Sequence, residues 1–235
     1  MLLNEIENAI EMANSEDSWM RNLLIELFPI CRSLSGPGNH KTLSILSRDI
    51  PLNIIKIPSG TEIFGWTVPD EWHPKSAQII DPSGKIYADF KKNNLHLVNY
   101  SQPIDKKVSR EELFQHIHSL PEQPDLIPYV TSYYHPHWGF CMTSKEKDEL
   151  PPGNYNVKID AKHIKGNLLY GEATLPGKKR DEIVISTYIC HPSMANDNLS
   201  GVVVSSALFK ILNELNDREY SYRFLFLPET IGSLC

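Results

Sequence analysis

The chain has 235 residues and a formal net charge of −6, which is enough length for one good-sized domain, or a domain with a small insertion, around a substantial core. It has no Lys/Arg-rich block, so its composition argues against binding to nucleic acid or to an anionic membrane. No apolar run approaches the roughly 20 residues that span a bilayer, and residues 1–12 mix Glu and Asn with their apolar residues, unlike a secretion signal. We therefore expect a cytoplasmic protein.

The four cysteines are far apart in the sequence. Cys31, Cys141, Cys190 and Cys235 show no C-x-x-C spacing, so the pattern indicates neither a disulfide framework nor a zinc knuckle. We interpret them as reduced thiols.

The N-terminal residues predict helices followed by a strand. Apolar residues recur at helical spacing on both sides of a break at 14–17, which predicts two short amphipathic helices; they are Ile6, Ile10, Met20, Leu23, Leu24 and Leu27. A turn rich in Ser, Gly and Pro follows at 31–40, and a helix resumes at 41–47. Residues 53–57 then read as a strand.

From residue 60 to residue 128 the sequence changes to short β-type runs separated by turn residues. The expected strands are 63–68, 77–80, 86–90 and 95–100, with a tight turn at Asp81-Pro82-Ser83-Gly84. A helix-like stretch at 109–120 and a Pro-rich linker at 121–128 close the segment. We expect a β-rich insertion at 60–128 that interrupts an α/β domain made of 1–59 and 129–235.

The C-terminal part alternates strands and a helix, which is typical of an α/β sheet. Strands are predicted at 155–159, 168–174 and 182–189, and a strand at 220–227 has apolar residues on both faces, which predicts a central position under helices. Between the last two strands lies a helix whose apolar face we assign to residues spaced by three and four, namely Val204, Leu208, Ile211, Leu212 and Leu215.

Chemically active residues directly follow two of these strands. His191 and Asp197 follow strand 182–189, and Glu229 follows strand 220–227. Ligands of open α/β sheets gather at the carboxyl ends of strands, and an imidazole with a carboxylate suits Zn²⁺. Glu229 is placed to act as general base toward a water that the metal activates.

Each of these residues also has a plainer interpretation. His191 can be a hydrogen-bonded loop histidine, and Asp197 can cap the following helix. Glu229 can pair with a cation or cap the turn at Gly232. The pairs His116/His118 and His135/His137 lack a nearby carboxylate or cysteine, so we interpret them as ordinary histidines, and Cys190 as a buried, inert thiol.

Two segments resemble motifs of co-catalytic zinc aminopeptidases. Asp197-Asn198-Leu199-Ser200-Gly201-Val202 resembles their D-N-x-S-G-V segment, and Glu229 with Ile231-Gly232 resembles their E-E-x-G segment. In that family the Asp bridges two zinc ions, an upstream His binds one of them, and the first Glu is the general base. The resemblance implies zinc, as one or two ions, with His191 and Asp197 as ligands and Glu229 as base.

The whole chain also resembles a bacterial family of aminopeptidase-like proteins in which a small β domain interrupts the peptidase domain and a winged helix follows. The segments that carry this likeness are 27–33, 89–96 and 187–193. It implies a three-layer αβα aminopeptidase-like domain with a β-rich insertion. The implied activity is a metal-dependent hydrolase acting on a peptide or small amide, with no nucleic-acid or membrane partner.

Three departures from the family pattern change this expectation. Ser193 stands where an acidic residue supports the ligand His, and Thr230 replaces the second Glu, which weakens the second metal position. The chain ends at Cys235, before the family's remaining ligands. We therefore expect an incomplete, C-terminally truncated member that has little activity alone and that could self-associate through an unpaired strand edge. The alternative is a non-catalytic binding or scaffold protein that keeps the fold.

Overall fold

The computed structural model describes residues 17–235, and its contacts divide the chain into two units. The first unit contains residues up to Asp70 together with Gly166–Cys235, and the second contains Glu71–Lys165. The helix expected around Ile6 and Ile10 lies outside the described residues.

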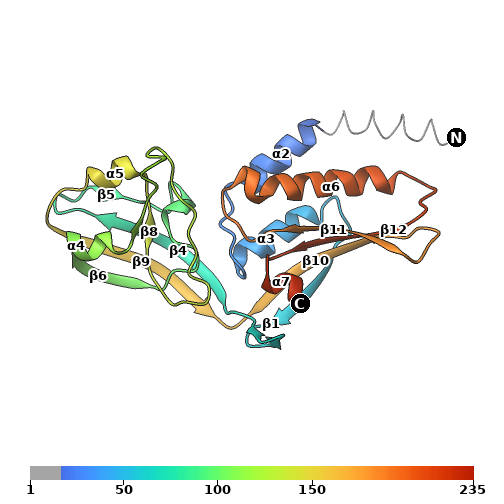
Figure 1. Cartoon of the computed structure of the whole chain (residues 1–235), viewed down its shortest axis with the longest axis horizontal. Coiled ribbons are helices and arrows are strands. Elements are labelled where there is room, and N and C mark those ends of the chain that lie inside the picture. Colours follow the sequence, from blue (N-terminus) through green and yellow to red (C-terminus); the bar gives the residue numbers. More distant parts are fainter. Residues whose placement is uncertain (1–16) are drawn as a thin grey trace. The chain divides into compact units, whose positions relative to one another are not determined.

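A mixed four-stranded sheet forms the centre of the first unit (Figure 1). Its strands, in spatial order, are β1 (Asn53–Pro58), β10 (Asn167–Leu175), β12 (Ser221–Leu227) and β11 (Glu182–Tyr188). Strands β11 and β12 are parallel, whereas β10 runs antiparallel to both of its neighbours. The four strands expected from the sequence at these places are confirmed, and 220–227 is a central strand as predicted. A small hairpin of β2 (Glu62–Ile63) and β3 (Trp66–Thr67) follows β1.

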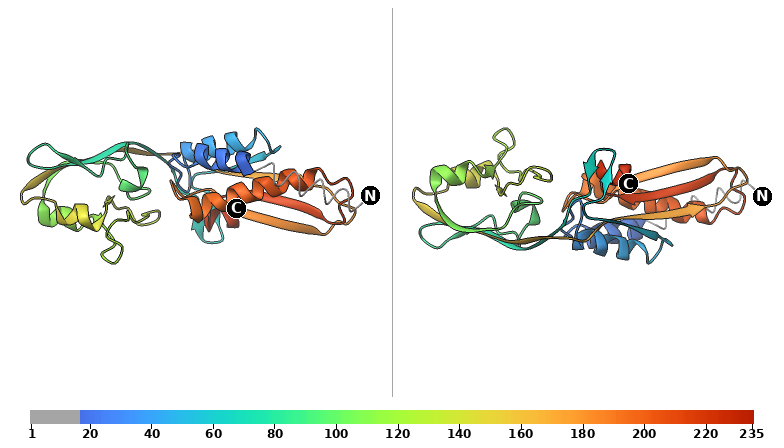
Figure 2. Two further views of the ribbon diagram at one scale, coloured as in Figure 1. Left: turned by 90° about the horizontal axis from the view of Figure 1, so that it is seen from above. Right: turned by 90° about the horizontal axis from the view of Figure 1, so that it is seen from below.

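Helices of the first unit lie along this sheet (Figures 1 and 2). They are α2 (Asp17–Leu27), α3 (Pro37–Leu46), the irregular turn η2 (Ala195–Leu199), α6 (Ser200–Asn213) and the short α7 (Ile231–Leu234). Helix α3 begins at Pro37, earlier than the expected residue 41. Proline suits the first turn of a helix, because a backbone N–H has no partner within the helix there and the φ of proline is already helical.

The core of the first unit lies between the helices and one face of the sheet. Phe224 and Phe226 alternate along β12, are 0% exposed, and pack in one cluster with apolar residues of α2, α3 and α6. On the other face Arg223 pairs with Glu172 of β10 and Glu182 of β11. Period-two alternation therefore turns Phe224 and Phe226 toward the helices and Arg223 to the opposite face, which also contains Leu225 and Leu227. The expected α/β class is confirmed.

The buried face of α6 matches the expected face in part: Leu208 and Leu212 pack against the core as predicted. Val204, assigned to the sheet, is 54% exposed, and the helix instead buries Val202, Val203 and Phe209. Residues 202–204 are all valine, so spacing alone could not choose among them. Two serines share the buried side, and Ser206 satisfies its hydroxyl by donating to the Val202 carbonyl at 2.7 Å.

The second unit has its own antiparallel sheet in the order β5, β4, β9, β6 (Figure 1). The strands are β4 (Glu71–Ile80), β5 (Ile86–Tyr87), β6 (Ile104–Ser109) and β9 (Asn154–Ile164), with a separate parallel pair of β7 (Ile117–His118) and β8 (Phe140–Cys141). Its helices are η1 (Asn94–His96), α4 (Arg110–Phe114) and α5 (Ser144–Asp148). The helix expected at 109–120 is thus one turn long. The strand expected at 95–100 is not formed: a 3-10 turn and two isolated β-bridges, at Leu97 and Asn99, stand in its place.

The boundaries of the second unit differ from the expected insertion of 60–128. Residues 155–159, expected in the sheet of the larger domain, belong to β9, where Ile159 pairs with both Ala77 and Ile104. Tyr155, Val157 and Ile159 are buried in this unit. Alternation identified the strand and its buried face, but alternation contains no information about which sheet a strand joins.

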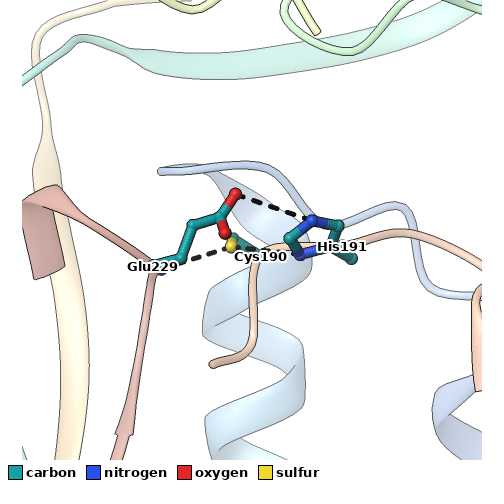
Figure 3. Close-up of side chains that lie close together, drawn as sticks. All are labelled: Cys190, His191 and Glu229. Carbon is teal, nitrogen blue, oxygen red and sulfur yellow. Dashed lines mark hydrogen bonds and ion pairs between the residues drawn. The ribbon is translucent and has the colours of Figure 1, made fainter. Parts of the chain in front are cut away.

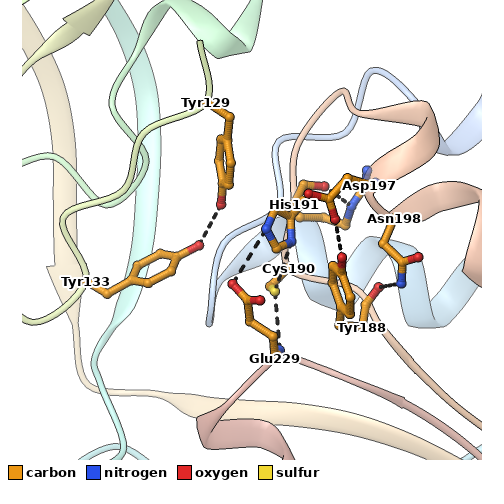
Figure 4. A network of polar contacts seen from close by, with 9 residues as sticks. Tyr129, Tyr133, Tyr188, Cys190, His191, Asp197, Asn198 and Glu229 are labelled. Carbon is orange, nitrogen blue, oxygen red and sulfur yellow. Dashed lines mark hydrogen bonds and ion pairs between the residues drawn. The ribbon is translucent and has the colours of Figure 1, made fainter. Parts of the chain in front are cut away.

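Two local features of the second unit are a tight turn and a pair of tyrosines. The turn at 81–84 is confirmed, since the Gly84 N–H donates to the Asp81 carbonyl at 3.0 Å and Gly84 has φ of 92°. The aromatic run after residue 128 contributes a hydrogen bond of 2.8 Å between the hydroxyls of Tyr129 and Tyr133 (Figure 4). Among residues 17–235, no helix combines the length and apolar character that crossing a membrane requires.

His137 of one histidine pair meets both histidines of the other pair. The ring of His116 stacks on Trp138 and on His137, with centroids 3.5 and 5.0 Å apart, and His118 meets His137 edge-on at 6.1 Å. Burial, together with the neighbouring imidazoles, lowers the pKa of His118 and of His137. The rings of His118 and His137 are therefore neutral in the folded protein at neutral pH.

Replacing Phe224 with Ala is expected to lower the free energy of unfolding of the first unit by about 3–5 kcal/mol, because it empties the centre of the core. Urea titration followed by intrinsic fluorescence measures this change. Val184→Ala on the neighbouring strand is the control, since Val184 is 55% exposed, and it is expected to cost less than about 1 kcal/mol. Equal losses for both variants would contradict the assigned core.

Acid is expected to destabilise the second unit through its histidine stack. Unfolded histidine has an ordinary pKa of about 6.5, whereas His118 and His137 have lowered pKa values in the folded state. Their contribution is therefore present above about pH 6.5 and lost as the pH falls through the folded-state pKa. We expect the melting temperature to fall between pH 7.5 and 5.0, and to fall less in His118→Gln.

Differential scanning calorimetry measures that dependence. His135→Gln is the matched control, because His135 is exposed and lies outside the stack. An acid response of His118→Gln that equals those of His135→Gln and the unchanged chain would refute the role of the stack.

Candidate metal centre

The candidate centre lies where β11 and β12 end. These parallel strands pair in register up to Tyr188 opposite Leu227, so the segments that follow them start at the same edge of the sheet. His191 comes three positions after the end of β11, and Glu229 two positions after the end of β12. The parallel register thus brings together two residues that are far apart in the sequence.

His191 and Glu229 face each other across these strand ends (Figure 3). The His191 Nε2 atom lies 3.5 Å from Glu229 Oε1, and the side chains are 7% and 40% exposed, respectively. The imidazole is therefore held in a buried position, whereas the carboxylate is open to water and to a small ligand.

Cys190 completes a compact group of donor atoms with these two residues. Its Sγ atom lies 3.4 Å from His191 Nδ1 and accepts the backbone N–H of Glu229 at 3.3 Å (Figure 3). Among the described residues, Cys190, His191 and Glu229 are the one group of three metal-ligand side chains whose donor atoms all lie within 4.8 Å of one another. Burial raises the pKa of the thiol to about 12, as expected for a buried thiol, but its contact with His191 was not predicted.

Asp197 lies beside this group and is attached to Tyr188. It is exposed on η2, and its carboxylate accepts a hydrogen bond from the Tyr188 hydroxyl (Figure 4). The Tyr188 ring packs 4.9 Å, centroid to centroid, from the His191 ring. The bond to Asp197 is the main reason that the pKa of Tyr188 rises to about 12. Tyr188 therefore connects the two residues predicted as ligands, a role that the sequence did not indicate.

Asp197 does not cap the helix that follows. The N-cap of α6 is Leu199, and no side chain bonds there. Asp197 and Asn198 have non-helical backbone angles inside η2, with φ of −120° and −140°. The loop thus turns the Asp197 side chain toward Tyr188 rather than toward the helix N-terminus.

The D-N-x-S-G segment has a direct structural explanation. The Asn198 side-chain amide donates to Thr187 Oγ1 at 2.7 Å and to the Tyr188 carbonyl at 3.2 Å, which ties the loop to the end of β11. A Cβ on Gly201 would lie only 2.4 Å from Asn198 Oδ1 and 2.8 Å from Thr187 Oγ1. Glycine is needed at 201 because the Asn198 side chain occupies the space that a larger residue would fill.

Arg32 is a buried side chain that holds the backbone of the centre in place. Its side chain is 1% exposed, its Nε donates to the His191 carbonyl at 2.8 Å, and its Nη1 donates to the Leu27 carbonyl at 2.8 Å. His191 is thereby anchored to the end of α2. The sequence included Arg32 in a segment of family resemblance but gave no reason for its role.

Burial is the main cause of a lowered pKa at His191. The nearby Arg32 guanidinium lowers it further, while Glu229 and Asp197 act in the opposite direction. The imidazole is neutral at neutral pH, and neutral imidazole is the form that binds metal.

The two substituted family positions do not join the donor group. Ser193 donates its hydroxyl to the Phe28 carbonyl at 2.9 Å, so it is turned away from the imidazole. Thr230 is exposed at the start of α7, with no side-chain capping bond. A neutral hydroxyl is a poor zinc ligand compared with a carboxylate, which agrees with a weakened second metal position.

The donor chemistry fits a zinc ion. A neutral imidazole nitrogen, carboxylate oxygens and a sulfur are the atom types that Zn²⁺ binds in proteins, and three of them lie within one ion's reach of each other. His191 would supply the nitrogen. The predicted ligand Asp197 does not belong to this group of three; its carboxylate accepts from Tyr188, whose ring packs against His191. The fit rests on this convergence of donors over two strand ends.

Gly201→Ala is expected to destabilise the first unit by about 1–3 kcal/mol, because the added methyl must displace the Asn198 side chain. Urea unfolding measures the change. The matched control on the same helix is Val204→Ala, at a position that is 54% exposed, for which we expect a change within about 0.5 kcal/mol. A Gly201→Ala protein as stable as the control would contradict the steric requirement for glycine at this position.

Known proteins resemble this chain in sequence and in structure. A protein of Clostridium acetobutylicum, named as a polysaccharide biosynthesis protein with an aminopeptidase-like domain, is 46% identical over 232 residues, which are 99% of this chain and 53% of that protein. A crystal structure of a peptidase from the same organism matches with a TM-score of 0.94 and 46% identity, over 98% of this chain and 55% of that one. The chain thus spans about half the length of these relatives.

More distant structures share the fold. A zinc aminopeptidase of Bacillus subtilis matches with a TM-score of 0.60 at 10% identity, over 92% of this chain and 61% of that one. A peptidase M28 precursor of Shewanella amazonensis matches with a TM-score of 0.59 at 10% identity, over 97% of this chain and 69% of that one. These likenesses confirm the expected aminopeptidase-like fold. The family model described as a domain of unknown function, DUF4910, matches residues 21–235, and the chain belongs to that family.

Proposed function

We propose that this chain contributes the zinc-binding half of a metal-dependent hydrolase of the aminopeptidase type, acting on a peptide or a small amide. The observation that carries the proposal is the 3.5 Å approach of His191 Nε2 and Glu229 Oε1 over the ends of two parallel strands. The relatives support it, because the similar proteins include a zinc aminopeptidase and a protein with an aminopeptidase-like domain. The name of the latter refers to polysaccharide biosynthesis, so the substrate class includes amides other than peptides.

The residues of the centre would divide the chemistry among them. His191 and Asp197 would hold the zinc ion, which when bound polarises the scissile carbonyl. Glu229, with its side chain 40% exposed, can reach a water molecule, take its proton and later pass that proton to the leaving amine. Tyr188 and Arg32 would hold the ligand residues in place through the contacts described above.

A non-catalytic binding or scaffold protein is the second candidate. The observation that favours it is the position of Ser193 and Thr230, neither of which supplies a carboxylate where the zinc aminopeptidases have one. A chain that keeps the fold but binds no metal would fit this alternative.

Zinc binding separates the two functions. We expect the purified chain to retain about one zinc ion after dialysis, measured by inductively coupled plasma mass spectrometry, and to lose it in His191→Ala or Asp197→Ala. Glu229→Gln should keep the ion, because a general base is not a ligand. His135→Ala, an exposed histidine of the second unit, is the control and should bind normally.

No zinc bound at micromolar concentration would support the scaffold function instead. Hydrolysis by this chain alone is expected to be slow, since a catalytic zinc ordinarily has three protein ligands and a water, and His191 and Asp197 supply two. A normal rate of aminoacyl p-nitroanilide hydrolysis that a chelator abolishes would contradict this ligand assignment.

A further inference from the structure

The sulfur of Cys190 connects the two strand ends that form the candidate metal centre. It accepts the backbone N–H of Glu229 at 3.3 Å and lies 3.4 Å from Nδ1 of His191, while Nε2 of the same ring lies 3.5 Å from Glu229 Oε1 (Figure 3). The imidazole is thus in contact on one side with a buried sulfur and on the other with a carboxylate. Cys190 itself is 0% exposed, so the sulfur has a fixed position.

A neutral imidazole has one N–H and one lone pair, and a neighbouring group decides which nitrogen has which. A metal needs the lone pair on the nitrogen that faces it. In many metal sites the other ring nitrogen donates to a carboxylate or a carbonyl, and this contact orients the ring. In this chain the sulfur is the group found at Nδ1.

We propose that Cys190 is the positioning residue for His191 in the metal-bound centre: with Nε2 bound to a metal ion, the Cys190 sulfur accepts the Nδ1–H and so fixes the orientation of the ring. The proposal deepens the proposed function, on which it rests. The sulfur would act in place of the acidic residue that Ser193 replaces, since the Ser193 hydroxyl bonds to the Phe28 carbonyl.

The surrounding contacts support a positioning role. Arg32 bonds to the His191 backbone carbonyl at 2.8 Å, and the Tyr188 ring packs against the imidazole with centroids 4.9 Å apart. These contacts fix the backbone and one side of the ring, but neither selects a ring nitrogen. The backbone N–H of Glu229, which follows the neighbouring strand, donates to the same sulfur. Cys190 therefore contacts both the imidazole of His191 and the backbone of the general base.

The position of the proton on the His191 ring tests the proposal in the zinc-loaded chain, because without a metal the Glu229 carboxylate beside Nε2 is a better acceptor than the thiol. We would record long-range proton–nitrogen correlation spectra of the chain, labelled with ¹⁵N-histidine and loaded with zinc, at about pH 7.5, and assign the His191 signals by their loss in His191→Gln. The expected result is a proton on Nδ1 in the unchanged chain and a mixture of Nδ1–H and Nε2–H in Cys190→Ala. A proton on Nε2 in the unchanged chain would overturn the proposal, whether or not the variant folds.

Zinc affinity provides the second readout. Cys190→Ala is expected to bind zinc 10–100-fold more weakly, as is usual when a residue that orients a ligand is lost, and Cys190→Ser should recover part of that loss because its hydroxyl can also accept. Cys141→Ala is the matched control: Cys141 is another thiol at 0% exposure, in the second unit. A Cys190→Ala protein with a lower melting temperature but unchanged affinity and tautomer would show a merely structural cysteine.

Cobalt distinguishes positioning from direct ligation. If Cys190 only positions His191, the Co²⁺-loaded chain should lack the intense near-ultraviolet charge-transfer band of a thiolate ligand. A band that disappears in Cys190→Ser would make Cys190 a ligand and overturn the positioning role. If the chain bound neither zinc nor cobalt, the proposed function would fail and the positioning role with it, whereas a chain that binds zinc with the proton on Nε2 would overturn the positioning role alone.

Discussion

The parallel pairing of β11 with β12 is the constraint on which the rest of the site depends. With Tyr188 opposite Leu227, the residues that follow both strands start from one edge of the sheet, and the imidazole of His191 meets the carboxylate of Glu229. Phe224 and Phe226 stabilise the pairing, because both rings are fully buried between the sheet and the helices. A shift of one residue between the strands would turn these rings to the opposite face and separate the two functional side chains.

The polar groups beneath the site are buried, and each has a defined contact. Arg32 is 1% exposed and bonds to two carbonyls, and the Cys190 sulfur lies between a backbone N–H and an imidazole. Burial of polar groups costs free energy unless such contacts are made, so this layer is stable only in one arrangement. The carboxylates of Glu229 and Asp197 are open to solvent. The site thus combines a buried, hydrogen-bonded layer with accessible acidic groups.

The second unit has a sheet and a core of its own. Residues 71–165 close their own antiparallel sheet around buried residues such as Trp72, Tyr155 and Phe140. Because this unit has its own core, its stability depends on its own contacts, including the stacked histidines. The first unit is likewise complete in its own core, formed by residues on both sides of the interruption.

The sequence alone determined four strands of the first unit's sheet, the central place of 220–227, and the loops that hold His191, Asp197 and Glu229, because alternation and the residues after strand ends are local properties. Only the tertiary structure decided which sheet 155–159 joins, which valines of α6 are buried, and that Tyr188, Cys190 and Arg32 surround the site. The Arg32 guanidinium and the His191 carbonyl are 159 positions apart in the sequence. Contacts between such distant residues follow from how strands and helices pack, and local sequence patterns do not encode that packing.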